Sequence, residues 1–229
     1  MKKLILIISF LLCSQFVFAD ETQLIQENSI QTRIDSVATD LLNYNKINKR
    51  IVFTYDSKSK KKTMNLYKNL TKRQVIVYKE LYKHVQTDDE LAAMLAREIS
   101  LAMKSYSGMW GGRIDSIQVA LGSKKFEMVA DKRAVDYMVN ANYNPLSLIV
   151  YINKTCPQKR SDFISRNNLT SKRLARIYEY ITFKYPQYLE DKDYIYNKYY
   201  QDFLLNSVEN RKLLKEKIDS KSKKEVKYE

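Results

Sequence analysis

One glutamate lies at a position where a helix would turn it toward the interior of the protein. The segment LAAMLAREISLAM (residues 91–103) has its large apolar residues on one helical stripe, and Glu98 lies near the centre of that stripe. An ionised carboxylate in an apolar interior is costly unless it meets a cation, a metal ion, hydrogen-bond donors or a proton. We therefore expect Glu98 to have a partner inside the fold.

A second predicted helix, from about Ser123 to Ala141, has the same feature. Glu127 falls within the angular range of its apolar face, and Asp131 lies one turn further on, near the edge of that face. If the two helices pack together, the carboxylates of Glu98 and Glu127 converge. Two like charges cannot both stay ionised there without compensation.

The elements around these helices predict a mostly helical α+β protein. β-branched and aromatic residues indicate two strands, at 51–55 and 74–78, on either side of a lysine-rich loop. Thr87 and Glu90 form a capping box before the Glu98 helix, and the turn at 142–145 stops the second helix through its proline. Further helices are predicted at about 22–48, 146–154, 171–185 and 195–218.

The N-terminus has the pattern of a secretory signal. Lys2 and Lys3 precede an apolar run that ends in a small residue at Ala19, and the run is shorter than the about 20 apolar residues of a membrane-spanning helix. We expect cleavage after Ala19, a periplasmic or secreted location, and no stable membrane span afterwards. The predicted organisation is a signal peptide at 1–19, an N-terminal helix at 20–47, a central domain at 48–190, and a basic C-terminal helix and tail at 191–229.

The number of cysteines limits the possible disulfides, and the net charge limits the possible binding partners. Cleavage would leave Cys156 as the single cysteine, which excludes an internal disulfide and favours burial of the thiol. The chain has a formal net charge of +14, and much of it lies at residues 58–62 and 212–227. These lysine clusters are typical of solvated surface or of contact with an anionic surface. Without a nucleic-acid motif, we do not expect nucleic-acid binding.

The order of these features resembles the zinc metallopeptidase family of HtpX, the CAAX endoproteases and the assembly protease BepA. In that family the first helix has H-E-x-x-H, the second supplies a glutamate ligand in E-x-x-A-D, and a turn ending in proline follows. The resemblance covers about residues 48–185 and implies a metallopeptidase-like (zincin) domain. The similar segments are Val75-Ile76-Val77, Asp89-Glu90-Leu91-Ala92-Ala93, Glu127-Met-Val-Ala130-Asp131, Asn142-Tyr143-Asn144-Pro145 and Arg173-Leu174-Ala175-Arg176-Ile177.

The chain departs from this family at both histidine ligands. Where the family has H-E-x-x-H, this chain has Arg97 and Leu101 at the two ends of the motif. An arginine cannot deprotonate to bind a metal and a leucine has no donor atom, so Glu127 is left as one vestigial ligand position. The only histidine, His84, lies outside the motif and is not expected to be a ligand. We therefore expect no bound zinc and no cofactor.

Without a zinc ion, the carboxylates at the remaining motif positions need another source of positive charge, and arginine could supply it. Glu98 keeps the general-base position but has no activated water to deprotonate. By its spacing Arg173 resembles the family's arginine near the substrate, with Asp131 in a supporting position behind Glu127. We predict that Arg97, joined by Arg173, holds Glu127 or Asp131, and that the pKa of Glu98 is raised. In the alternative, Arg97 snorkels to solvent.

Three functions remain open. The first is a catalytically inactive pseudopeptidase that binds an extended polypeptide or an envelope protein, with the strand at 75–78 pairing with that polypeptide. The second is an active metalloendopeptidase with a different metal arrangement, or another hydrolase built from Glu98, Glu127 and Asp131. The third is a basic envelope or adhesion protein whose lysine clusters bind an anionic surface.

Overall fold

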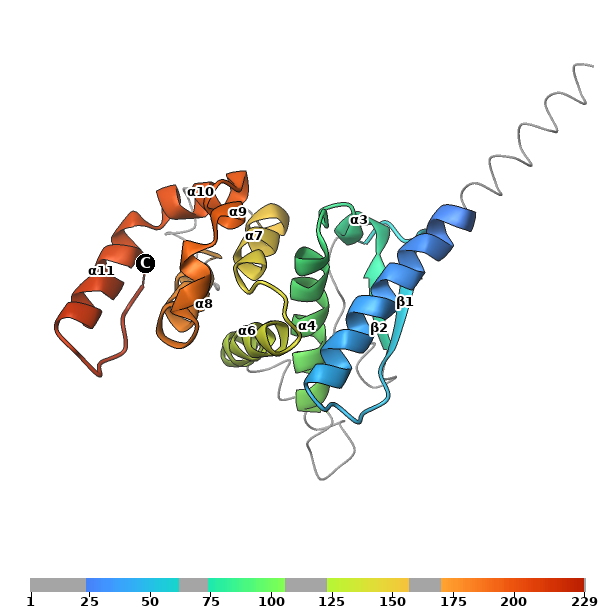
Figure 1. Ribbon diagram of the computed structural model, residues 1–229, viewed down its shortest axis with the longest axis horizontal. Coiled ribbons are helices and arrows are strands. Elements are labelled where there is room, and N and C mark those ends of the chain that lie inside the picture. The colour runs from blue at the N-terminus through green and yellow to red at the C-terminus, as the bar shows by residue number, and fades with distance from the viewer. Residues whose placement is uncertain (1–23, 62–73, 106–122, 157–169, 229) are drawn as a thin grey trace, which may run out of the picture.

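The computed structural model describes residues 24–61, 74–105, 123–156 and 170–228, without the side chains of residues 104–105 and 123–127 (Figure 1). It is mostly helical with one small parallel sheet, which confirms the predicted α+β class. The elements are a helix at 24–44, β1 (Val52–Asp56), β2 (Gln74–Tyr78), α3 (Lys79–Tyr82), α4 (Asp88–Ser105), α6 (Ser123–Asn140), α7 (Leu146–Thr155), α8 (Thr170–Lys184), the 3-10 helix η1 (Pro186–Glu190), α9 (Lys192–Ile195), α10 (Lys198–Asn206) and α11 (Val208–Asp219).

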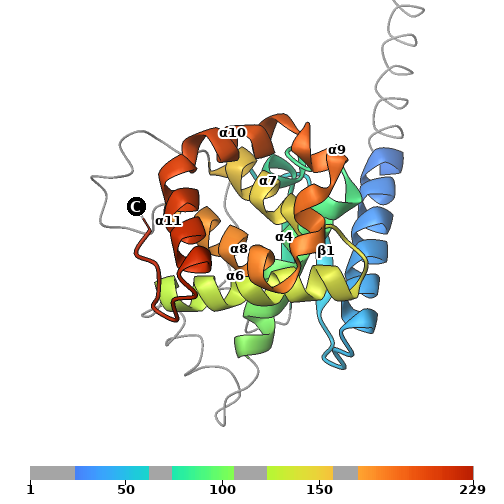
Figure 2. The same ribbon diagram turned by 60° about the vertical axis from the view of Figure 1, so that its left-hand side comes forward.

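These elements form successive layers along the molecule. The helix at 24–44 and the sheet lie at one end, α4 lies in the middle, and α11 lies at the opposite end (Figure 1). Between α4 and α11 stand α6, α7, α8 and α10, and α4 packs directly against α6 and α7. The turned view of Figure 2 shows α6 running beneath α8 and α11. This arrangement places α4 at the centre of the hydrophobic core.

The sheet consists of β1 and β2 in parallel, with Phe53 opposite Val75 and Tyr55 opposite Val77. Both strands begin within one residue of their predicted starts, because β-branched and aromatic residues suit a pleated, half-buried surface. The outer edge of β1 is capped by Gln31. The side chain of Gln31 accepts a hydrogen bond from the Tyr55 amide (2.7 Å) and donates one to the Phe53 carbonyl (3.1 Å).

Helix α4 is buried nearly all round, so the prediction of a single apolar stripe was too narrow. From Leu91 to Ala102 every side chain is buried except that of Arg97, which is partly exposed. The predicted cap is present in part. Thr87 Oγ accepts from the Glu90 amide (3.2 Å), but the Glu90 carboxylate accepts from the amide of Gln86, one residue before the cap.

Helix α6 ends close to the predicted residue by a different device. Asn142 adopts a left-handed backbone (φ 61°), and the amide of Tyr143 bonds back to the Met138 carbonyl (2.9 Å). Pro145 is instead the N-cap of α7, next to Asn144, whose side chain accepts from the Leu146 amide (2.9 Å). The predicted inward face of α6 is confirmed, with Ala130, Ala134, Met138 and Ala141 all buried.

The prediction of one helix over residues 195–218 was wrong, because the chain breaks there into short helices. The Asn197 side chain caps α10 by accepting from the amides of Tyr199 (2.9 Å) and Tyr200 (3.3 Å). Ser207 then separates α10 from α11. The Asn197 side chain competes with the helical backbone for these amides, so it favours a cap over a helix interior, whereas the Ser207 side chain forms no capping hydrogen bond.

Two further predictions concern the thiol and the N-terminus. Cys156 is exposed, so the prediction that it is buried was wrong; it follows the last residue of α7, where the chain leaves the packed face of that helix. The predicted signal peptide at 1–19 lies outside the described residues. Within the described ranges, no helix combines the length and apolarity that a bilayer crossing requires.

Candidate functional site

Four charged side chains from α4, α6 and α8 meet inside the protein. Arg97 and Glu98 come from α4, Asp131 from α6 and Arg173 from the first turn of α8. We call these four residues the arginine–carboxylate cluster. Glu98 is 4% exposed and Asp131 is 1% exposed, so both carboxylates lie inside the packed helices. The sequence predicted all four positions as parts of one site, and the structure brings them together.

Asp131 is held mainly by Arg173. The Arg173 Nε donates to one Asp131 oxygen and its second nitrogen donates to the other, both at 2.6 Å. Arg97 Nε lies 3.4 Å from Asp131 Oδ1, at salt-bridge distance. A forked arginine–carboxylate pair fixes orientation as well as charge. The prediction that both arginines hold a carboxylate of α6 is therefore confirmed for Asp131; the side chain of Glu127 lies outside the described part.

Glu98 receives weaker compensation than Asp131. Its Oε1 accepts from Arg97 at 3.0 Å. Burial raises the pKa of Glu98 to about 7, although the charges of Arg97 and Arg173 oppose this rise. The predicted upward shift is confirmed, and the alternative in which Arg97 snorkels away from the site is wrong. The side chain of Glu98 thus gains and loses a proton near neutral pH.

Tyr151 of α7 also faces this cluster, although it was not among the residues predicted for the site. Its side chain is buried, and its pKa is raised first by burial and then by the negative charge of Glu98. The available signal was a phenol at the end of the mostly apolar run LSLIVY (residues 146–151), because a tyrosine in a buried helix needs a partner for its hydroxyl.

These residues do not fit a zinc site of the kind that the family resemblance implies. Leu101 is buried and has no donor atom, while the Arg97 guanidinium occupies the cluster and would repel a cation. In residues 24–61, 74–105, 123–156 and 170–228, no group of three or more histidine, cysteine, aspartate or glutamate side chains could hold a metal. His84 lies near Lys154, where burial and then the lysine charges lower the pKa of its imidazole.

A second buried carboxylate on α4 was predicted only as a cap. Glu90 Oε1 accepts from Lys154 Nζ at 2.6 Å, and both side chains are 3% exposed. Lys154 belongs to the last turn of α7 and also donates to the Gln86 side chain (2.8 Å). This pair ties the start of α4 to the end of α7.

A hydrogen-bond network joins two of the segments on which the family resemblance rests. Asp89 accepts from the Asn144 amide (3.0 Å) and from the Tyr194 hydroxyl (2.8 Å). The Ser147 hydroxyl donates to the Asp89 carbonyl (2.8 Å), and the Asn144 side chain donates to Asp191 (2.7 Å). The start of α4 therefore contacts the turn between α6 and α7, which fixes the angle at which α4 meets the other helices.

Comparisons of the chain with protein-family models, with curated proteins and with solved structures found no match. The resemblance to zinc metallopeptidases therefore stays a prediction from sequence.

Proposed function

We propose that the protein is an exported, metallopeptidase-like pseudopeptidase that binds an extended polypeptide without cutting it. The observation that supports this proposal is the place of Arg97. It stands where the resembled family has its first histidine ligand, and its guanidinium contacts Glu98 and Asp131 inside the fold. Positive charge that a metal would supply thus comes from arginine.

The burial of the cluster favours a structural role over a hydrolytic one. A general base must come within hydrogen-bond reach of the proton that it removes. Glu98 and Asp131 are almost fully buried, and Asp131 already has both oxygens bonded to Arg173. In this role the cluster holds α4, α6 and α8 together and so preserves the shape of the former site.

The sheet offers one edge for a bound polypeptide. Gln31 caps the backbone of β1 at Phe53 and Tyr55, so strand addition on that side would displace existing hydrogen bonds. Among the described strands, β2 pairs with β1 alone. An extended polypeptide beside β2 would continue the sheet through main-chain hydrogen bonds, which are largely independent of sequence.

Amide hydrogen exchange with and without a neutral, unfolded polypeptide tests the binding. We expect the amides of Gln74–Tyr78 to gain protection, with a smaller change in β1. Measurement at high salt removes non-specific attraction between a basic protein and its partner. Protection confined to exposed lysine loops and lost in high salt would instead favour the basic adhesion protein.

Metal analysis and a cleavage assay test the absence of hydrolysis. We expect less than stoichiometric zinc after dialysis and no cleavage of an unfolded substrate. One zinc per chain, together with chelator-sensitive cleavage that is lost in Glu98→Gln, would overturn the proposal.

A further inference from the structure

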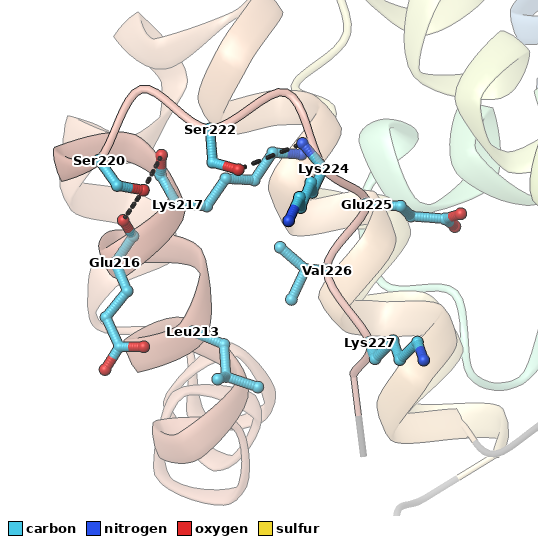
Figure 3. Close-up of a pocket in the computed structure, with 9 residues that line it drawn as sticks. All are labelled: Leu213, Glu216, Lys217, Ser220, Ser222, Lys224, Glu225, Val226 and Lys227. Carbon is cyan, nitrogen blue, oxygen red and sulfur yellow. Dashed lines mark hydrogen bonds between the residues drawn. The ribbon is translucent and has the colours of Figure 1, made fainter.

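A hollow of about 310 Å³ lies between α6, α8, α11 and the C-terminal segment (residues 220–228). A second hollow of about 310 Å³, between α11 and this segment, adjoins it and shares Lys217 and Glu225 in its lining (Figure 3). Figure 3 shows the segment turning back beside α11. We call the first space the α6–α8–α11 hollow. It is separate from the edge of β2, which lies toward the other end of the molecule (Figure 1).

Positive charge exceeds negative charge in the lining of this hollow. Both carboxylates there are already paired, Glu179 with Lys217 (2.7 Å) and Glu225 with Arg176 (2.8 Å). Lys132 and Lys223 complete the charged lining. Neither lysine forms an ion pair with a carboxylate in the described part of the chain. The hollow therefore has two positive charges to offer to a ligand.

Apolar side chains stand beside these lysines. Phe183 is 55% exposed, and Met128 is partly exposed on the same lining. Lys132 Nζ lies 5.5 Å from the centre of the Tyr180 ring, so one of the two lysines rests on an aromatic face. A ligand that fits this lining has carboxylate groups and at least one apolar side chain.

The C-terminal segment already places one carboxylate against this surface, although the segment SKSKKEVKY as a whole is basic, with four lysines and one glutamate. The C-terminal segment has no helix or strand after residue 219, yet Tyr228 is only 4% exposed. Its Glu225 reaches the lining of the hollow and pairs with Arg176. The segment thus uses one carboxylate and one aromatic anchor, and leaves Lys132 and Lys223 without acidic partners among the described residues.

We propose that the α6–α8–α11 hollow binds an acidic, extended segment of a partner polypeptide. Carboxylates of the partner pair with Lys132 and Lys223, and an apolar side chain of the partner covers Phe183. Glu225 restricts this site by holding Arg176, so its carboxylate competes with those of the partner, while Lys223 of the same segment stays in the lining and attracts them. A peptide with spaced carboxylates can place them at Lys132 and Lys223 and keep them away from Glu179 and Glu225, which a continuous polyanion or an anionic lipid surface cannot do.

Fluorescence anisotropy of a labelled peptide with alternating glutamate and leucine or phenylalanine tests the site in the full chain. We expect Lys132→Glu with Lys223→Glu to weaken binding by at least about tenfold, since attraction becomes repulsion at two contacts. The matched control is Lys58→Glu with Lys60→Glu, which changes the net charge equally at exposed lysines next to β1 and should change affinity by less than about twofold. If the glutamate pair impairs folding, Lys132→Gln with Lys223→Gln replaces it.

Two further measurements separate this site from general electrostatic attraction. We expect Glu225→Gln to strengthen peptide binding by about two- to fivefold, because it frees Arg176 for the partner. Vesicles with anionic lipid should not displace the peptide. An equal loss in the Lys58 and Lys60 control, an unchanged affinity in Glu225→Gln, or displacement by anionic vesicles would each overturn the proposal.

Discussion

Two glutamates on the same helix, Glu90 and Glu98, are both buried, but the protein compensates them differently. Glu90 has a partner for each oxygen, with Lys154 Nζ at 2.6 Å from one and the Gln86 amide at 2.8 Å from the other. Glu98 accepts from Arg97 at 3.0 Å, while the shorter bonds of Arg173 go to Asp131. The pKa of Glu98 accordingly rises to about 7, with burial as the largest cause.

The difference teaches that burial of a carboxylate does not by itself indicate a reactive site. A fully paired buried carboxylate connects two elements, as Glu90 does between α4 and α7. An under-compensated one changes its protonation state instead. Of these two buried carboxylates on α4, Glu98 is the one whose compensation is incomplete.

The largest effect is expected at the fully paired glutamate. Lys154→Met should destabilise the protein by about 3–5 kcal/mol, because it leaves the charge of Glu90 buried without its cation. Denaturant unfolding at neutral pH measures the change. The double variant with Glu90→Gln should recover most of the loss, since the stranded charge is removed. A double variant as unstable as Lys154→Met would mean that packing of the lysine, and not its charge, is responsible.

The forked pair in the arginine–carboxylate cluster should come next. Arg173→Gln should cost about 2–4 kcal/mol, because Asp131 loses both of its shortest hydrogen bonds and keeps Arg97 at a longer distance. Arg176→Gln is a matched control, since its partner Glu225 is largely solvent-exposed and such pairs contribute about 0–1 kcal/mol. Equal losses in the two variants would contradict the assignment of Arg173 as the main support of Asp131.

A smaller cost is expected at the other arginine of the cluster. Arg97→Ala should destabilise by about 1–3 kcal/mol, because Glu98 loses its hydrogen bond and Asp131 its second cation. The same change should raise the pKa of Glu98 further, since the guanidinium now opposes the effect of burial. Titration followed by NMR of labelled glutamate measures this shift. An unchanged pKa would show that Arg97 does not compensate Glu98.

The smallest effect, and the most dependent on pH, is expected at Glu98 itself. Its folded-state pKa of about 7 lies above its ordinary value of 4.5, so between these values the folded protein binds a proton that the unfolded chain releases. Stability contributed by this group is therefore full below about pH 4.5 and falls as pH rises through 7. Glu98→Gln should be nearly neutral at pH 5 and stabilising by about 1–3 kcal/mol at pH 8.

Unfolding curves of Glu98→Gln and the unchanged protein across this range provide the measurement. A Glu98→Gln variant that is less stable than the unchanged protein by the same amount at pH 5 and pH 8 would contradict this prediction. It would show that Glu98 stabilises the fold as a hydrogen-bond acceptor and does not destabilise it as a buried charge. Glu90→Gln across the same range serves as the comparison, because it removes a carboxylate whose two oxygens are both bonded.

The sequence by itself determined the local elements and the identity of the charged cluster. Both strands, the helix around Glu98 and the helix that ends at Asn140 follow from short-range patterns of β-branched residues, apolar spacing and caps. The inward position of Glu98 follows from helical angles alone, whereas the same angles place Asp131 only near the edge of the apolar face of its helix. Arg97 and Arg173 could be named as partners because a buried carboxylate requires a nearby cation.

The tertiary structure decided how the charges were shared and which surfaces were left open. Arg173 of α8 forks onto Asp131 of α6, and Lys154 of α7 pairs with Glu90 of α4. Both pairs depend on the packing of helices whose paired residues are more than 40 positions apart along the chain. The burial of α4 on all sides, the breaks at Asn197 and Ser207, and the exposure of Cys156 likewise depend on neighbours. Helical spacing specifies the direction of a side chain from its own helix, but the nearest opposite charge is set by elements that only folding brings together.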